Sequence, residues 1–265
     1  MTATNNIAVQ IPQTPTSAET AYMLRLADNA LILGQRLSEM CGHAPEMELD
    51  IALTNISLDL IGQAKLLFEH VLTLEDLAPN ADALALSRSE AQYTNLLLVA
   101  QPNVDFAHIV LRQYLFSTMQ KRQYQTLLSS TDKHLAAIAE KSLKEIAYHI
   151  RFAKTWVLRL GDGTEESKDR MADALSCLWR YTGEMFAIDH ILAQVTDSGL
   201  TADFTNSYKD WQTDTQNLLA QAGDLKLPEV GQMQMGGTQG SHDEHLGNIL
   251  SDLQFMQLKY PGLQW

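Results

Sequence analysis

The segment KEIAYHIRF, residues 144–152, holds an acidic side chain and an imidazole at a spacing that suits metal binding. Glu145 and His149 are four positions apart, so an α-helix places them on one face, one turn from each other. Carboxylates and imidazoles are common ligands of iron and other first-row metals. Two ligands do not complete a site, so other parts of the chain would have to supply the rest.

The helices that would position these residues follow from the apolar spacing and from the helix-ending signals. Apolar residues recur every three or four positions over most of the chain, and prolines and glycines separate the periodic stretches. Thr16 with Glu19 is a potential capping box for a first helix, and Asn103 is a potential cap for a third. We expect long helices at about residues 17–40, 47–72, 104–128 and 132–160.

The links between these helices predict the fold. The first and second helices, and the third and fourth, are joined by short links, whereas the link at 74–101 is long and holds a short helical piece at about 82–98. This order is typical of a ferritin-like four-helix bundle with one crossover connection. We therefore predict an all-α protein with a disordered N-terminal tail at 1–16 and a single domain at 17–265.

Within that domain, the bundle helices occupy about residues 17–160, and residues 161–265 form accessory elements. The segment 223–240 contains five glycines and a proline, which favours an extended, irregular arm. Further helices are expected at about 164–195, 201–222 and 242–258.

Composition narrows the functional classes. The net charge of -13, from 32 acidic and 19 basic residues, would repel a phosphate backbone, so no nucleic-acid partner is expected. Cys41 and Cys177 are far apart, which argues against a thiolate zinc or iron–sulfur cluster, and we expect both to be packing residues. No signal-peptide pattern is present and no apolar run approaches about 18 residues, so we expect a cytoplasmic protein without membrane contact.

A ferritin-like bundle can hold a carboxylate-bridged metal pair, which needs a Glu from each of two helices and a Glu-x-x-His motif from each of the other two. The first expected helix offers Asp28 near its middle. The second offers Asp59, but Gly62 stands three residues later, where the motif needs a histidine. The third contains no Asp or Glu between residues 106 and 131, so it supplies no carboxylate.

The fourth expected helix retains part of the pattern. Ile146 stands three residues before His149, where the motif needs a glutamate, and Glu145 shares the face less closely. We therefore favour a bundle without a catalytic metal pair, in which Asp28, Asp59, Glu145 and His149 have protein partners, because unpaired buried charges are costly. The alternative is a self-contained di-iron or di-manganese carboxylate oxidase with these residues as an atypical ligand set.

Four stretches of the sequence resemble a known family. They are LRLADNALILGQRLSEMCGHAPEMELDIALTNISLDLIGQA, LLLVAQPNVDFA, KEIAYHIRF and HDEHLGNILSDLQFMQLKYPGLQW. They resemble the C subunits of bacterial ring-1,2-phenylacetyl-CoA epoxidases, and the resemblance runs from about residue 18 to residue 265. It implies a ferritin-like subunit of a multicomponent oxygenase that epoxidises the ring of phenylacetyl-CoA in aerobic phenylacetate degradation.

The resemblance also implies partners and cofactors. In that family the A subunit is ferritin-like, carries the di-iron site and binds the CoA ester, and the C subunit is its non-catalytic structural partner. A small B subunit and a reductase with flavin and an iron–sulfur cluster complete the complex. This chain is then expected to hold no cofactor, with Asp59, Gly62, Ile146 and His149 at remnant ligand positions, and it could form a homo-oligomer when alone.

Two further groups of residues allow more than one interpretation. His242 and His245 flank Glu244 at a spacing that can bind a divalent metal, but we favour packing and a helix capped by Ser241. A set of basic residues could meet the phosphates of CoA at a subunit boundary, although a solvated face is the preferred interpretation. These basic residues are Lys121, Arg122, Lys141, Lys144, Arg151 and Lys154.

Aromatic residues supply candidates for a subunit interface, since large aromatics often dominate such contacts. Core packing is an equal explanation for Trp156 and Trp179. Tyr260 and Trp265, in the closing segment KYPGLQW, are the better candidates for docking against a partner.

Overall fold

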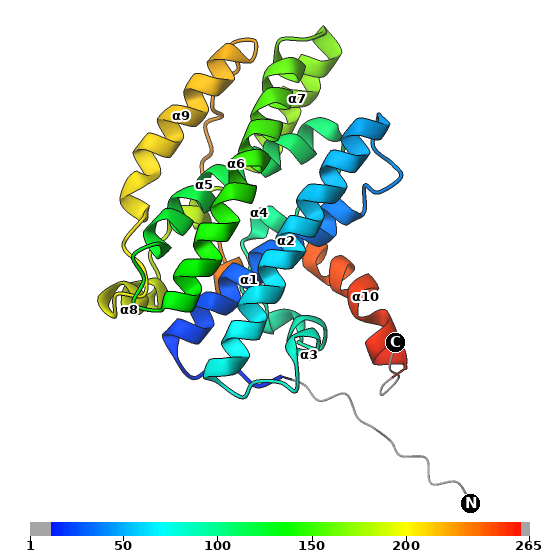
Figure 1. Ribbon diagram of the computed structural model, residues 1–265. Coiled ribbons are helices and arrows are strands. Elements are labelled where there is room, and N and C mark those ends of the chain that lie inside the picture. The colour runs from blue at the N-terminus through cyan, green and yellow to red at the C-terminus, as the bar shows by residue number, and fades with distance from the viewer. Residues whose placement is uncertain (1–11, 261–265) are drawn as a thin grey trace, which may run out of the picture.

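The computed structural model describes residues 12–260, and every regular element in that range is a helix. The bundle consists of α1 (Ala18–Ser38), α2 (Met47–Leu74), α5 (Phe106–Leu127) and α6 (Lys133–Gly161). In Figure 1, α1 packs along α2, α5 packs along α6, and α2 also lies against α6. The predicted all-α, ferritin-like architecture is confirmed.

The long connection between α2 and α5 is built from short helical pieces. It contains α3 (Ala81–Leu86), the 3-10 turn η1 (Glu90–Gln92) and α4 (Leu97–Ala100). Residues 93–96 between η1 and α4 are non-helical, so the single piece expected at about 82–98 is divided. This connection runs along α1. Glu75 binds Thr16 at the start of the helix, Thr94 binds Asp28 in its middle, and the carbonyl oxygen of Ala100 accepts from Arg36 near its end.

The accessory elements that follow α6 are also more divided than the sequence suggested. They are α7 (Glu165–Trp179), η2 (Gly183–Phe186), α8 (His190–Asp197), η3 (Thr205–Ser207), α9 (Tyr208–Gln221), η4 (Gly237–Gln239) and α10 (Glu244–Lys259). The prediction of one helix at 164–195 is therefore wrong. A side chain at Gly183 would place its Cβ 2.7 Å from the Cβ of Met233, so glycine at this position allows the arm to approach closely.

The arm at 223–240 is irregular, as predicted, and folds onto its own bundle. Buried Glu184 binds it, because its carboxylate accepts hydrogen bonds from the backbone of Gly236 at 2.6 Å and of Leu97 at 3.0 Å. A Cβ on Gly237 would lie 2.4 Å from the carbonyl oxygen of Asn95, so only glycine permits this approach. One carboxylate thus joins the arm to the crossover connection.

Helix caps differ from the expected ones by one or two positions. Ser17, rather than Thr16, caps α1, and Asp105, rather than Asn103, caps α5 by accepting from the backbone of His108. The Asn103 amide instead donates to the carbonyl oxygen of Arg36. α10 is capped by Asp243 and not by Ser241. In each case the acceptor closer to the first helical turn takes the cap.

Part of the predicted N-terminal tail is held in place. The carbonyl oxygen of Pro12 accepts from Gln92, the backbone of Gln13 donates to Leu77, and Thr16 binds Glu75. The tail prediction is therefore wrong for residues 12–16, whereas residues 1–11 lie outside the described range.

α1 and α2 differ in how much of their surface is buried. Every residue of α1 from Tyr22 to Gly34 is buried, because α2, α4, α8 and α10 surround it. α2, in contrast, exposes 72% of Met47, 54% of Ile51 and 60% of Leu58. α2 is also long and apolar enough to cross a membrane by length and composition, which we did not expect, but half of that stretch is buried, as in a core helix.

The two cysteines correct another expectation. Cys41 in the turn after α1 and Cys177 in α7 are both exposed and carry free thiols, so neither is a packing residue. For Trp156 and Trp179 we considered core packing and an interface role equally. Trp179 is buried and Trp156 is partly buried against Phe106, so both pack within this chain.

Candidate functional site

Asp28 is the only one of the four candidate ligands that is a fully buried acid, and an arginine neutralises it. Both terminal nitrogens of Arg88 donate to the Asp28 carboxylate, one of them at 3.1 Å. The backbone of Thr94 adds a third hydrogen bond at 2.9 Å. Asp28 is 0% exposed and Arg88 is 3% exposed, so a buried two-pronged ion pair occupies the position of the first-helix acid.

The surroundings of Arg88 favour its charged form. Its guanidinium stacks 4.1 Å from the centre of the Tyr93 ring and also donates to the carbonyl oxygens of Leu84 and Gln92. Burial would lower the pKa of Arg88, but the charge of Asp28 and the hydrogen bonds to it raise the pKa above the usual value. Asp28 is therefore bound to a permanent cation.

His149 and Asp59 form a second pair, between α6 and α2. Their Nε2 and Oδ2 atoms are 3.1 Å apart, so Nε2 carries the hydrogen and donates it to the carboxylate. His149 is fully buried, whereas about a third of the Asp59 side chain is exposed. The other ring nitrogen, Nδ1, is buried without a hydrogen-bond partner among the described residues.

Glutamines join the remaining acid to the acid-free helix. Gln63 of α2 donates to Glu145 of α6 at 2.9 Å and accepts from Gln120 of α5 at 3.1 Å. Lys141 lies 4.0 Å from Glu145 on the outer side. On α5, the buried amide of Gln120 is therefore the group that this network contains, and α5 has no carboxylate that could bridge two metal ions.

The two remaining candidate positions face different surroundings. Ile146 is fully buried in the apolar core. Gly62 lies at a partly exposed position, and a Cβ there would meet no atom within 4 Å. The neighbouring Gln63, 1% exposed, is the polar residue of α2 that binds Glu145 and Gln120.

These groups do not assemble into a metal centre. Within residues 12–260, no three of Asp28, Asp59, Glu145 and His149 bring ligand atoms within 4.8 Å of one another. The buried polar atoms without partners in this region are Nδ1 of His149, the amide oxygens of Gln113 and Gln120, and the Tyr124 hydroxyl. One imidazole nitrogen with neutral oxygens is a donor set for ordered water rather than for two metal ions, so the residues do not fit a di-iron pair.

Two comparisons with known proteins place the chain in a family. A family model described as "Phenylacetic acid catabolic protein" matches residues 1–265. The chain belongs to this family. It is also 42% identical over 246 residues to a protein from Escherichia coli (strain K12) that is named as the C subunit of 1,2-phenylacetyl-CoA epoxidase, covering 93% of this chain and 98% of that protein.

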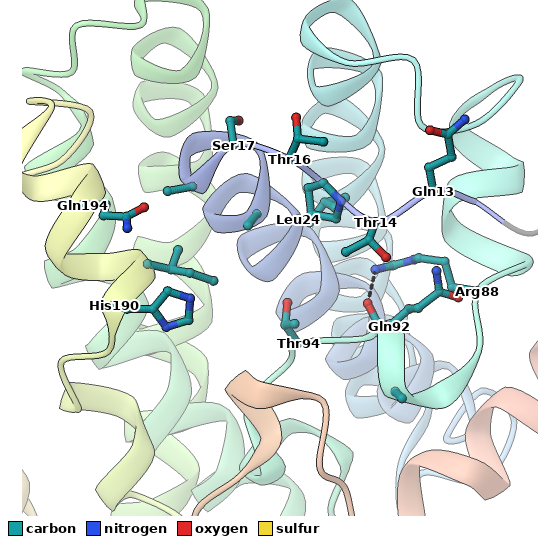
Figure 2. Close-up of a pocket in the computed structure, with 15 residues that line it drawn as sticks. Gln13, Thr14, Thr16, Ser17, Leu24, Arg88, Gln92, Thr94, His190 and Gln194 are labelled. Carbon is teal, nitrogen blue, oxygen red and sulfur yellow. Dashed lines mark hydrogen bonds between the residues drawn. The ribbon is translucent and has the colours of Figure 1, made fainter.

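In this member of the phenylacetic acid catabolic protein family, a cavity lies beside the Asp28 pair at the start of α1. It measures about 370 Å³ and is lined on one side by Arg88, Gln92 and Thr94 and on the other by His190 and Gln194 of α8. Figure 2 shows these side chains facing one another across the start of α1, with Arg88 hydrogen-bonded to Gln92. The Arg88 charge is already paired with Asp28, so the cavity wall offers no free cation at this position.

The other sequence motifs are separated by the fold. The His242 ring binds the carbonyl oxygen of Tyr93, and the backbone of His245 donates to the Asp243 cap. Among the described residues, His242, Glu244 and His245 do not bring three ligand atoms within 4.8 Å of one another. Among the basic residues, Arg122 pairs with Asp214 and Lys141 lies near Glu145. Lys121, Arg122 and Lys154 do line one hollow between α5, α6 and α9.

Sequence reasoning missed Arg88 and the pair Gln63 and Gln120. Arg88 lies in the crossover connection, 60 positions from Asp28, and no short motif links the two. The glutamine pair could have been predicted, because the sequence of α5 contains many amide and hydroxyl side chains and no acids. A cluster of His108, Asp173 and Cys177 was also missed.

Proposed function

We propose that this chain is a non-catalytic structural subunit of a multicomponent di-iron oxygenase that epoxidises the ring of phenylacetyl-CoA in phenylacetate degradation. In this proposal it supports a catalytic ferritin-like A subunit that carries the iron, and it works in the cytoplasm with a small B subunit and a reductase. The name of the relative from Escherichia coli supports the pathway and the membership in an epoxidase complex.

The observation that carries the structural role is the Arg88 pair on Asp28. A guanidinium bound to the acid of the first helix prevents that acid from binding a cation, because both carboxylate oxygens already accept from it. α5 supplies amides and no acid. A self-contained di-iron or di-manganese oxidase would need both positions, so the donor chemistry disfavours that alternative.

A supporting subunit also needs a surface for its partner, and two exposed apolar groups are available. One lies on α2 and consists of Met47, Ile51 and Leu58, which share a helix face. The second lies on the last turns of α10, where Phe255 is 50%, Leu258 57% and Tyr260 44% exposed. Figure 1 shows the end of α10 extending beyond the bundle.

We assign the A subunit to these surfaces because an obligate contact of this kind buries more than about 2,000 Å² and is rich in apolar residues. Tyr260 is the interface candidate that the described residues include. Trp265 lies outside them. By covering α2, the partner would gain a rigid apolar support for the helices that hold its own ligands.

Co-expression with the A subunit, followed by size-exclusion chromatography and iron analysis, tests the proposal. We expect a stable complex in which iron follows the A subunit, and little iron in this chain when it is purified alone. A chain that stays separate while the other subunits assemble would contradict the structural role. About two irons in the isolated chain, lost in Asp59→Asn, would instead support the oxidase.

A further inference from the structure

A mixed cluster of potential metal ligands joins α5 to α7, away from the centre of the bundle. His108 belongs to the first turn of α5, and Asp173 and Cys177 lie four positions apart on α7. An imidazole nitrogen, a carboxylate oxygen and the thiol sulfur all lie within 4.8 Å of one another. These three ligand types occur together in zinc sites.

The imidazole of His108 is oriented toward the other two ligands. Its Nδ1 lies 2.8 Å from Oδ1 of Asp105, the residue that also caps α5. The carboxylate accepts this hydrogen, so Nδ1 carries it and Nε2 keeps a free lone pair. A carboxylate that fixes the far nitrogen of a histidine ligand is a recurring feature of metal sites.

The free nitrogen points into the cluster. Nε2 lies 3.8 Å from Oδ2 of Asp173, and it makes no hydrogen bond to any residue between 12 and 260. His108 itself is only 2% exposed, so its ring is held in one position beside the other two ligands. Asp173 and Cys177 are exposed, so an ion can reach the site from solvent.

We propose that His108, Asp173 and Cys177 bind one divalent transition-metal ion, with Zn²⁺ as the ion that fits these ligands best. In tetrahedral zinc sites, bond lengths of about 2.0 to 2.3 Å place neighbouring ligand atoms about 3.3 to 3.6 Å apart. The cluster reaches this geometry when the exposed side chains of Asp173 and Cys177 turn toward the buried His108. A water molecule would complete the coordination.

Such an ion would connect the bundle to its accessory layer. His108 is on a bundle helix and the other two ligands are on α7, so the ion would fix the start of α5 against the middle of α7. Its role would be structural and independent of the proposed epoxidase function, since none of its ligands belongs to the bundle centre.

Titration of the full-length chain with Zn²⁺ under reducing conditions, and with Co²⁺ as a spectroscopic probe, tests the site. We expect one ion per chain and a near-ultraviolet cobalt–thiolate band. Cys177→Ser should abolish the band and weaken Zn²⁺ binding by at least about tenfold. Asp105→Asn should weaken binding by about 10- to 100-fold while it preserves the helix cap.

The matched control is Cys41→Ser, which removes the other exposed thiol and should leave both the band and the affinity unchanged. Asp59→Asn should also leave them unchanged, which separates this site from any metal in the bundle centre. Circular dichroism confirms that each variant is folded. A band that survives in Cys177→Ser, a band that disappears in Cys41→Ser, or the lack of stoichiometric binding would overturn the proposal.

Discussion

Arg88 and Asp28 form a buried, two-pronged ion pair between the crossover connection and the first bundle helix. The pair explains how a buried acid can remain on the first bundle helix without a metal to neutralise it. It also makes the fold depend on both partners, because a buried charge that loses its counter-charge is strongly destabilising.

Replacing Asp28 with alanine should therefore lower the free energy of unfolding by about 3 to 5 kcal/mol, since it leaves the Arg88 guanidinium buried and unpaired. Urea denaturation measures the change. As a control, Arg170→Ala removes the exposed pair with Glu166 and should cost at most about 1 kcal/mol. Equal losses in the two variants would show that the buried pair has no special role.

The N-cap of α6 allows a matched comparison at a single position. The Asp132 carboxylate accepts from the backbone of His134 and Leu135 and lies 2.6 Å from Nε2 of His70. Asp132→Ala should destabilise the chain by about 1 to 2 kcal/mol, whereas Asp132→Asn keeps a cap and should cost less. Thermal unfolding of both variants measures this order. If the asparagine variant were the less stable one, capping would not explain the contribution of Asp132.

The Glu75 carboxylate should make stability depend on acid pH. Desolvation would raise its pKa, but hydrogen bonds from Thr16 and Ser17 outweigh this effect and lower the pKa from 4.5 to about 2. A carboxyl with a lowered pKa stabilises the fold fully above its unfolded value. The contribution of Glu75 should therefore be complete above about pH 4.5 and disappear as the pH falls toward about 2.

Urea midpoints of the wild type and Glu75→Gln, measured from pH 7 downward, test this dependence. The two midpoints should differ by a constant amount above about pH 4.5 and converge below it. A difference that grows as the solution becomes more acidic has the opposite sign and would rule out the assigned hydrogen bonds as the cause.

The exposed face of α2 provides a test of docking. Leu58→Asp places a charge in the centre of the proposed contact and should weaken the complex with the A subunit by at least about tenfold, or about 1.4 kcal/mol. Val104→Asp is a suitable control, because Val104 is 64% exposed but lies in the link before α5. Surface plasmon resonance with the purified A subunit measures both. Unchanged binding by Leu58→Asp would remove α2 from the interface.

Much of this architecture could be predicted from local sequence patterns. Helical spacing and two short links were sufficient for the bundle, and the lack of acids in α5 could be read directly from residues 106–131. The close packing of Met233 on Gly183 could not, because these two residues are 50 positions apart in the chain. Local propensity contains no information about such a contact.

The candidate site divides in the same way. From the sequence we expected protein partners for three acids and one imidazole, and each of them has a partner. These residues are Asp28, Asp59, Glu145 and His149. It did not identify Arg88, because a lone arginine in a crossover connection has no periodicity that assigns it to a distant acid. Long-range ion pairs of this kind become visible only once the chain is folded.

The most direct test of the structural role is the turnover of phenylacetyl-CoA by the reconstituted complex that contains Asp59→Asn/Glu145→Gln in this chain. These changes keep the size of both side chains but remove the charges that a metal pair would require. We expect assembly and a kcat within about twofold of the wild-type complex. A complex that assembles normally but loses turnover to the background rate would contradict the account, because it would place essential chemistry in this chain.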